Sequence, residues 1–178
     1  QPDTNTVDYV FHIERGPTVD IHLKGASLRK GLLKKYIPVY EENAVDDDLL
    51  NEGRRNLRDY FQIKGYFDVE VQVKQEYDQA KDHLHVIYQV ERSEKHKLVA
   101  VDIEGNKYFR DSEIRERMLT QPAGMLLVQG RFSQTLLSRD LESIASLYRD
   151  NGFQQVKVTS EVQDDYRGQQ GHIRAVIH

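Results

Sequence analysis

Apolar and polar residues follow two kinds of spacing along this chain, and the same succession of spacings occurs twice. A stretch that alternates strictly ends at Gly25, residues with helical spacing follow, and alternation resumes after Gly65. The second succession has Gly105 and Gly152 at the corresponding places. A period of two predicts half-buried strands, whereas a period near 3.6 predicts helices with one buried face. We therefore interpret the chain as a tandem repeat.

The spacing of these glycines sets the size of the repeat. Gly25 and Gly105 are 80 positions apart, and Gly65 and Gly152 are 87 positions apart. A period near 80 is longer than that of the common helical solenoids, so each repeat is expected to be a small domain. We expect one domain at residues 16–92 and a second at residues 93–178. Residues 1–15 are expected to be the last strand of a preceding unit or a linker.

Each unit is predicted to run strand, helix, helix, strand, strand. The fold class expected is α+β, with a three-stranded mixed sheet in each unit covered on one face by two antiparallel helices, because this is the simplest closed arrangement of these elements. The alternating segments that predict the strands are residues 19–23, 67–73 and 84–90, and then residues 99–103, 156–162 and 173–177. The joints between units are short and carry few apolar residues, so contacts between units are expected to be modest.

Polar residues and glycines mark the expected ends of the helices. Side chains that can accept a hydrogen bond from a free backbone N–H favour a helix start, and a glycine with positive φ is typical of a helix end. Gly65 and Gly152 are expected to end the second helix of each unit, and Gly25 and Gly105 to end the first strands. The expected helix starts are Ser27, Asp46 to Asp48, Asp111 or Ser112, and Ser133.

Composition excludes several classes of function. The net charge is −4 and no block of basic residues is present, which removes the main electrostatic contribution to nucleic-acid binding. There is no cysteine, so disulfides and thiolate chemistry are excluded. The sequence has neither a recognisable nucleophile with its base nor a phosphate-binding glycine loop. We expect a protein that is not an enzyme and has no cofactor.

Several short motifs, in the same order in both units, carry a resemblance to a known family. They are Val101 to Asn106 at the end of a first strand, Gly65 to Val69 and Gly152-Phe153 at the helix-to-strand junctions, and Glu14 to Pro17 at a joint. Together they resemble the POTRA (polypeptide-transport-associated) domain, although Ala26 stands where the second unit has Asn106. The tandem arrangement is similar to the periplasmic arm of BamA-type outer-membrane assembly factors.

The resemblance implies a scaffold in the periplasm beneath a C-terminal membrane β-barrel of the full-length chain. Such an arm receives unfolded outer-membrane proteins and works with periplasmic chaperones or outer-membrane lipoproteins. The arm of a TamA-type or two-partner secretion transporter is the alternative. A small α/β metal-binding or enzymatic domain is the alternative from a different class.

The resemblance also implies that the second strand of each unit, residues 67–75 and 155–163, lies at a sheet edge. An exposed edge can pair with another extended chain through its backbone. Polar outward residues can equally serve to protect such an edge from aggregation. Phe67 is expected on the buried face of its strand, together with Val69 and Val71. The candidate partner-binding residues are Asp68, Glu70, Gln72 and Lys74 in the first unit and Gln155, Lys157, Thr159 and Glu161 in the second.

Two further features have more than one interpretation. His83 and His85 are two positions apart on a predicted strand, so they share a face and can approach a metal ion. Without a cysteine or a specified carboxylate beside them, a solvated polar face is the favoured interpretation, and no metal site is predicted. The apolar segment Met125 to Val128 is expected to pack beneath the helices, and the alternative is a patch that docks a partner.

Overall fold

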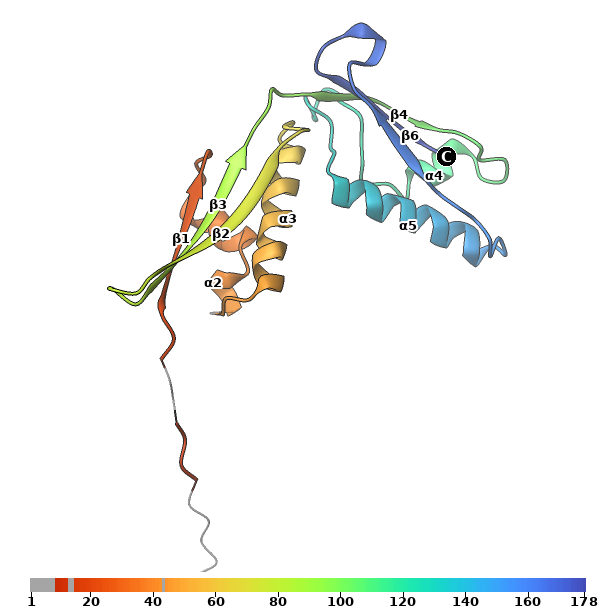
Figure 1. Cartoon of the computed structure of the whole chain (residues 1–178). Helices are drawn as coiled ribbons and strands as arrows, with labels where there is room; N and C mark the ends of the chain where they lie inside the picture. Colours follow the sequence, from red (N-terminus) through yellow and green to blue (C-terminus); the bar gives the residue numbers. More distant parts are fainter. Residues whose placement is uncertain (1–8, 13–14, 43) are drawn as a thin grey trace, which may run out of the picture.

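The computed structural model describes residues 9–12, 15–42 and 44–178, and it contains two α+β units in succession (Figure 1). The first unit consists of β1 (Thr18–Lys24), α1 (Lys30–Tyr36), α2 (Val39–Glu42), α3 (Asp47–Ile63), β2 (Glu70–Asp78) and β3 (His83–Glu91). The second consists of β4 (Lys97–Ile103), α4 (Asp111–Arg115), α5 (Gln134–Asp150), β5 (Ser160–Gln163), the 3-10 turn η1 (Tyr166–Gly168) and β6 (His172–Ile177). This content confirms the α+β class. The short helix α2, which directly follows Pro38, was not expected.

The strand expected within residues 1–15 lies largely outside the described residues. Residues 9–12 are described, and no strand is assigned to them. Tyr9 and Phe11 there are exposed.

Both sheets have the same topology, with the last strand of the unit in the centre. The order is β1-β3-β2 in the first sheet and β4-β6-β5 in the second. The first strand of each unit runs parallel to the central strand, and the second strand runs antiparallel to it. Each sheet is therefore mixed, and the second strand of each unit lies at an edge as expected.

The second strand of the second unit is shorter than the sequence predicts. β5 begins at Ser160, and residues 155–158 lie in no strand. Thr159 exchanges both backbone hydrogen bonds with His178, each 2.9 Å long. The pairing of β5 with β6 covers Ser160 to Gln163 only.

Each sheet buries one face against its helices. Figure 1 shows α3 along one face of the first sheet and α5 along one face of the second. Separate clusters of buried residues form the two cores, with Leu57, Val86 and Tyr88 in the first and Leu98, Ile144 and Ala175 in the second.

The second unit also buries a carboxylate that the pattern did not predict. Asp140 of α5 accepts hydrogen bonds from the backbone N–H groups of Leu119 and Thr120, at 2.7 and 2.8 Å.

The predicted capping residues are correct for the two long helices and wrong for α1 and α4, whose N-caps are Arg29 and Arg110. Asp46 accepts from Leu49 N at 2.8 Å, and Ser133 accepts from Leu136 N at 3.1 Å. α1 begins only at Lys30, because the chain first brings Leu28 against the core in a non-helical conformation. α4 begins at Asp111 itself, where Glu113 accepts from the N–H of the preceding Arg110 at 2.8 Å.

The two long helices end in the same way. Gly65 has φ 95° and Gly152 has φ 94°, the positive values expected for a residue just past a helix end. The N–H after each glycine bonds back to the residue five positions earlier, from Tyr66 to Phe61 O and from Phe153 to Tyr148 O. Each glycine N–H bonds three positions back. Both junctions are therefore Schellman motifs, and only glycine adopts this φ without a steric cost.

The joint between the units is packed more closely than expected. The N–H of His96 donates to Gly65 O at 2.7 Å, and the side chain of Gln62 accepts from Gln134 N at 2.9 Å. Phe67 does not share the buried face of β2 with Val69 and Val71, as the alternation predicted. It lies in the turn before β2 and packs against Phe132 of the second core, with ring centroids 5.2 Å apart.

Candidate partner-binding edge of the first sheet

β2 offers a long backbone edge. It pairs with β3 along its whole length from Glu70 to Asp78, and no strand formed by the described residues lies on its other side. Alternate N–H and C=O groups on that outer side have no partner within the sheet. The predicted residues Glu70, Gln72 and Lys74 lie in this strand and are exposed. Asp68 lies in the turn that precedes it.

A groove runs between this edge strand and α3. Its volume is about 430 Å³, and Arg54, Arg58 and Gln62 of α3 line it together with residues 67–72 and Gln134. The Nε atom of Arg58 is buried, and it has no hydrogen-bond partner among the described residues. Arg54, by contrast, donates to Asn51 Oδ1 at 3.3 Å. The groove therefore combines an edge strand with a guanidinium donor that can bond a carbonyl or carboxylate oxygen.

The candidate residues of the second unit do not form a comparable edge. Gln155 and Lys157 lie outside any strand, and Thr159 is held by the backbone of His178. Glu161 is in β5, which has four residues where β2 has nine. The structure thus gathers Glu70, Gln72 and Lys74 on one continuous edge and leaves the second set dispersed.

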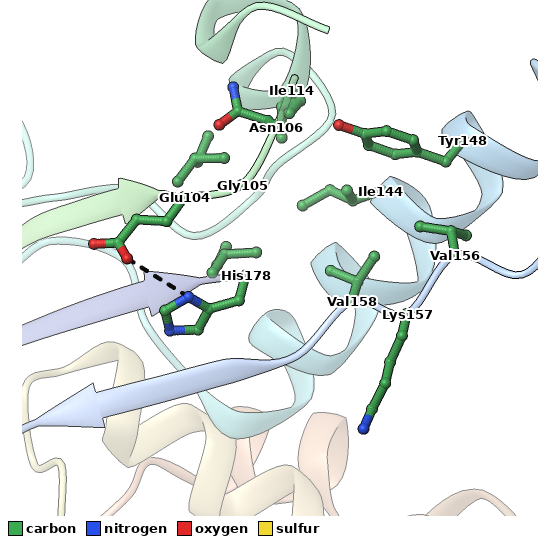
Figure 2. A pocket seen from close by; sticks show the side chains of 12 residues that line it. Glu104, Gly105, Asn106, Ile114, Ile144, Tyr148, Val156, Lys157, Val158 and His178 are labelled. Carbon is green, nitrogen blue, oxygen red and sulfur yellow. Dashed lines mark ion pairs between the residues drawn. The ribbon is translucent and has the colours of Figure 1, made fainter. Parts of the chain in front are cut away.

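A pocket lies beside the ends of β4 and β6 (Figure 2). Its volume is about 340 Å³, and the side chains that line it are mainly apolar, among them Ile144, Tyr148 and Val158. At its rim His178 Nδ1 lies 3.6 Å from Glu104 Oε2, the contact drawn as a dashed line. Lys157 extends away from the pocket. Such a lining suits an apolar side chain.

The segment Met125 to Val128 does not pack beneath the helices, so that prediction was wrong. Met125 is 98% exposed and Leu126 is 95% exposed. The N–H groups of Gly124 and Gly130 both donate to Leu127 O, each at 2.9 Å. These bonds close a tight turn and leave the two apolar side chains at its tip.

The titratable groups with shifted pKa values have structural causes. Burial raises the pKa of Tyr88, whose hydroxyl donates to Leu50 O. A hydrogen bond to Asp82 raises the pKa of Tyr77 at the end of β2. The N–H of Arg110 lowers the pKa of Glu113 at the start of α4. None of these side chains lines the groove beside β2.

The structure also brings together polar residues that the sequence analysis did not connect. Asp20 and His22 of β1 lie beside His83 and His85 of β3 on the exposed face of the first sheet. The strand pairing puts Asp20 directly opposite His85. The alternation of the first strand could have indicated this cluster, because Asp20 and His22 occupy its polar positions and therefore share the exposed face.

Comparison with known families agrees with this architecture. The model of the POTRA family, described as a surface antigen variable number repeat, matches residues 19–93 and again residues 97–177. The chain belongs to the POTRA family. These two matches place one POTRA repeat on each of the two sheets.

Solved structures share the fold of this POTRA pair. POTRA domains 3–5 of BamA from Haemophilus influenzae match with a TM-score of 0.57 and 15% identity, over 91% of this chain and 60% of theirs. BamA from Haemophilus ducreyi lacking POTRA domains 1–3 matches with a TM-score of 0.60 and 13% identity, over 92% of this chain and 28% of its own. The POTRA pair thus spans only part of these relatives. Within its described residues, no helix has both the length and the apolar composition to cross a membrane.

Proposed function

We propose that this POTRA pair is a non-catalytic periplasmic scaffold that receives unfolded outer-membrane β-barrel proteins as extended segments paired to β2. The observation that carries the proposal is the unpaired outer edge of β2, nine residues long, beside the groove under α3. Pairing through the backbone requires no particular client side chain, so one edge can accept many sequences.

β2 is the best of the available edges. β5 has only four residues. The other edge of the first sheet, β1, borders a hollow lined by Val39, Tyr40 and Val45, with Val19 and Ile21 of the strand itself, so part of α2 lies close to that edge. A client on β2 gains about 0.5–1.5 kcal/mol from each backbone hydrogen bond, and the side chains of Arg54 and Arg58 line the groove beside it. The exposed polar side chains of Glu70, Gln72 and Lys74 keep the free edge from pairing indiscriminately.

The scaffold acts with other components. In this proposal it is the soluble arm of an outer-membrane protein whose C-terminal part is a membrane β-barrel. Periplasmic chaperones or outer-membrane lipoproteins are its accessory partners. Nucleic acid is not a partner, since the net charge is −4.

The proposal is tested by titrating the isotope-labelled chain with synthetic ten-residue peptides in which apolar and polar residues alternate. Amide signals of residues 70–78 and the side-chain Nε–H of Arg58 should shift together as peptide is added. A nitroxide on the peptide should broaden the β2 signals more than those of β1. Shifts confined to the helices or to Met125 to Val128 would contradict backbone pairing and indicate docking of side chains.

Matched substitutions separate backbone pairing from side-chain binding. The hydrogen bond from Thr18 N to Asp82 O shows that even-numbered residues of β3 bond to β1, so its odd-numbered residues bond to β2. The N–H of Glu70 therefore faces β3, whereas the N–H of Gln75 faces the free side. Gln75→Pro removes this outer N–H and Gln75→Ala keeps it, so only the proline is expected to weaken peptide binding. Lys157→Pro is the control in the second unit. Because Lys157 lies outside any strand, this proline should leave the affinity unchanged. Equal losses for Gln75→Pro and Gln75→Ala would show that the side chain is what the peptide contacts.

A further inference from the structure

Three imidazoles and one carboxylate meet on the helix-free face of the first sheet. Asp20 Oδ2 lies 2.9 Å from His83 Nδ1 and 3.9 Å from His85 Nδ1. His22 Nε2 lies 3.3 Å from His85 Nδ1. The donor atoms of Asp20, His83 and His85 all lie within 4.8 Å of one another. These four side chains are called the β1–β3 histidine cluster below.

The strand register explains why they meet. In the parallel pair β1–β3, Asp20 is directly opposite His85, and Thr18 is opposite His83. Asp20 and His22 are two positions apart, as are His83 and His85, so all four side chains project from the same face. The opposite face carries the core residues Ile21, Val86 and Tyr88. The cluster is therefore held by two hydrogen-bonded strands of a rigid sheet.

The distances suit a tetrahedral metal ion. Zinc binds imidazole nitrogen and carboxylate oxygen at about 2.0–2.2 Å, which places neighbouring ligand atoms of a tetrahedron about 3.3–3.6 Å apart. The separations of 2.9, 3.3 and 3.9 Å in the cluster lie around this value. Imidazole and carboxylate together favour zinc and neighbouring transition metals over magnesium or calcium, which prefer oxygen ligands.

The edge strand β2 supplies suitable outer groups. Glu76 is directly opposite His85, and Asp78 is directly opposite His83, on the far side of β3 from β1. Ligating histidines usually donate their second N–H to a carboxylate, which fixes the ring and increases its basicity. Both carboxylates are on the same face as the histidines, because directly paired residues project to the same side of a sheet.

A second group of possible ligands is less suitable. His96 Nε2 lies 3.9 Å from Asp68 Oδ2 and 3.6 Å from Asp164 Oδ1 at the joint between the units. This group has a single imidazole, and its two carboxylates come from different units and are about half exposed. It serves as the internal control for the β1–β3 histidine cluster.

We propose that the β1–β3 histidine cluster is a zinc site, with Asp20, His83 and His85 as ligands and His22 beside His85. The ion joins the edge strand β1 to the central strand β3. This inference does not depend on the scaffold function, since the site faces away from the helices and from the groove under α3.

The test uses the 178-residue chain without a histidine tag, titrated with zinc chloride by calorimetry and with cobalt(II) by visible absorption. One ion per chain and the intense absorption of tetrahedral cobalt are expected. His83→Gln and His85→Gln should each weaken zinc binding by more than about tenfold, since loss of even an outer-shell partner costs about 10–100-fold. His96→Gln should leave the affinity unchanged within about twofold.

The folded parent provides a measurement that needs no variant. Zinc should shift the ring signals of His22, His83 and His85 in NMR spectra while that of His96 stays in place, and it should slow hydrogen exchange in β1. Absence of binding at 100-fold excess zinc would overturn the proposal. So would binding that survives His83→Gln and His85→Gln but is lost in His96→Gln, because the ion would then be at the joint.

Discussion

The backbone has the same conformation at corresponding glycines of the two units, but the atoms that surround those glycines differ. Gly65 and Gly152 have nearly the same φ and the same Schellman hydrogen bonds. A Cβ on Gly65 would lie 3.1 Å from both His96 O and Gln129 Cγ, which belong to the segment that follows. A Cβ on Gly152 would have no atom within 4 Å. The same local motif is thus crowded by the following segment in the first unit, and it meets no described atom within 4 Å in the second.

The glycines that end the first strands, Gly25 and Gly105, differ in the same way: the glycine of the first unit is the more crowded of the two. A Cβ on Gly25 would collide with Val90 O of β3, whereas one on Gly105 would meet no described atom within 4 Å. A repeated motif therefore determines the backbone conformation. The residues that pack against the motif from other parts of the chain determine how much a substitution there costs in stability.

The largest effect is expected for Gly25→Ala. The added methyl group collides with a backbone carbonyl that cannot move without displacing β3, so the first unit should lose about 3–5 kcal/mol of unfolding free energy. Gly105→Ala, which meets no atom, is the matched control and should cost about 1 kcal/mol. Urea unfolding followed by hydrogen exchange of each unit measures both. Equal losses would show that the contact with Val90 does not distinguish the two positions.

Phe67→Ala tests the packed joint directly. Phe67 belongs to the first unit but packs against Phe132, so its removal should destabilise the second unit by about 2 kcal/mol, less than a fully buried Phe because it is only half-buried. Faster hydrogen exchange is expected around Phe132 rather than in β2. Faster exchange restricted to the first unit would contradict the assignment of Phe67 to the second core.

Gly65→Ala combines backbone strain with crowding at the joint. We expect a loss of about 2 kcal/mol, of which about 1 kcal/mol arises from the positive φ alone. The amides of His96 and of residues 129–134 should change their NMR shifts, because the added Cβ pushes on His96 O and Gln129. Unchanged signals in those residues would mean that the joint accommodates the added methyl group without rearranging.

Gly152→Ala is expected to have the smallest effect. The site is open, so only the positive φ opposes the substitution, and the cost should be about 1 kcal/mol. The midpoint of urea unfolding of the second unit measures it. A loss larger than that of Gly65→Ala would reverse the comparison, and it would indicate a contact at Gly152 in solution that the structure does not contain.

Much of the fold followed from the sequence because its signals are local. The helix ends at Gly65 and Gly152 and the caps at Asp46 and Ser133 each depend on residues within five positions of one another, and all four were predicted. The edge position of β2 came from the resemblance to POTRA domains, and the strand order confirms it. The role of its residues in binding a client stays a prediction.

Only the tertiary structure decided which distant residues meet. Alternation predicted a strand over residues 155–163, and β5 covers Ser160 to Gln163 of them. Phe67 continued the alternation of β2, yet the core of the next unit receives it. Asp20 and His22 joined His83 and His85 because the pairing of β1 with β3 fixes one register out of several. The periodicity of a sequence determines elements and their faces through neighbours in the chain, whereas pairing register and contacts between units depend on atoms brought together from far apart, on which the local pattern carries no information.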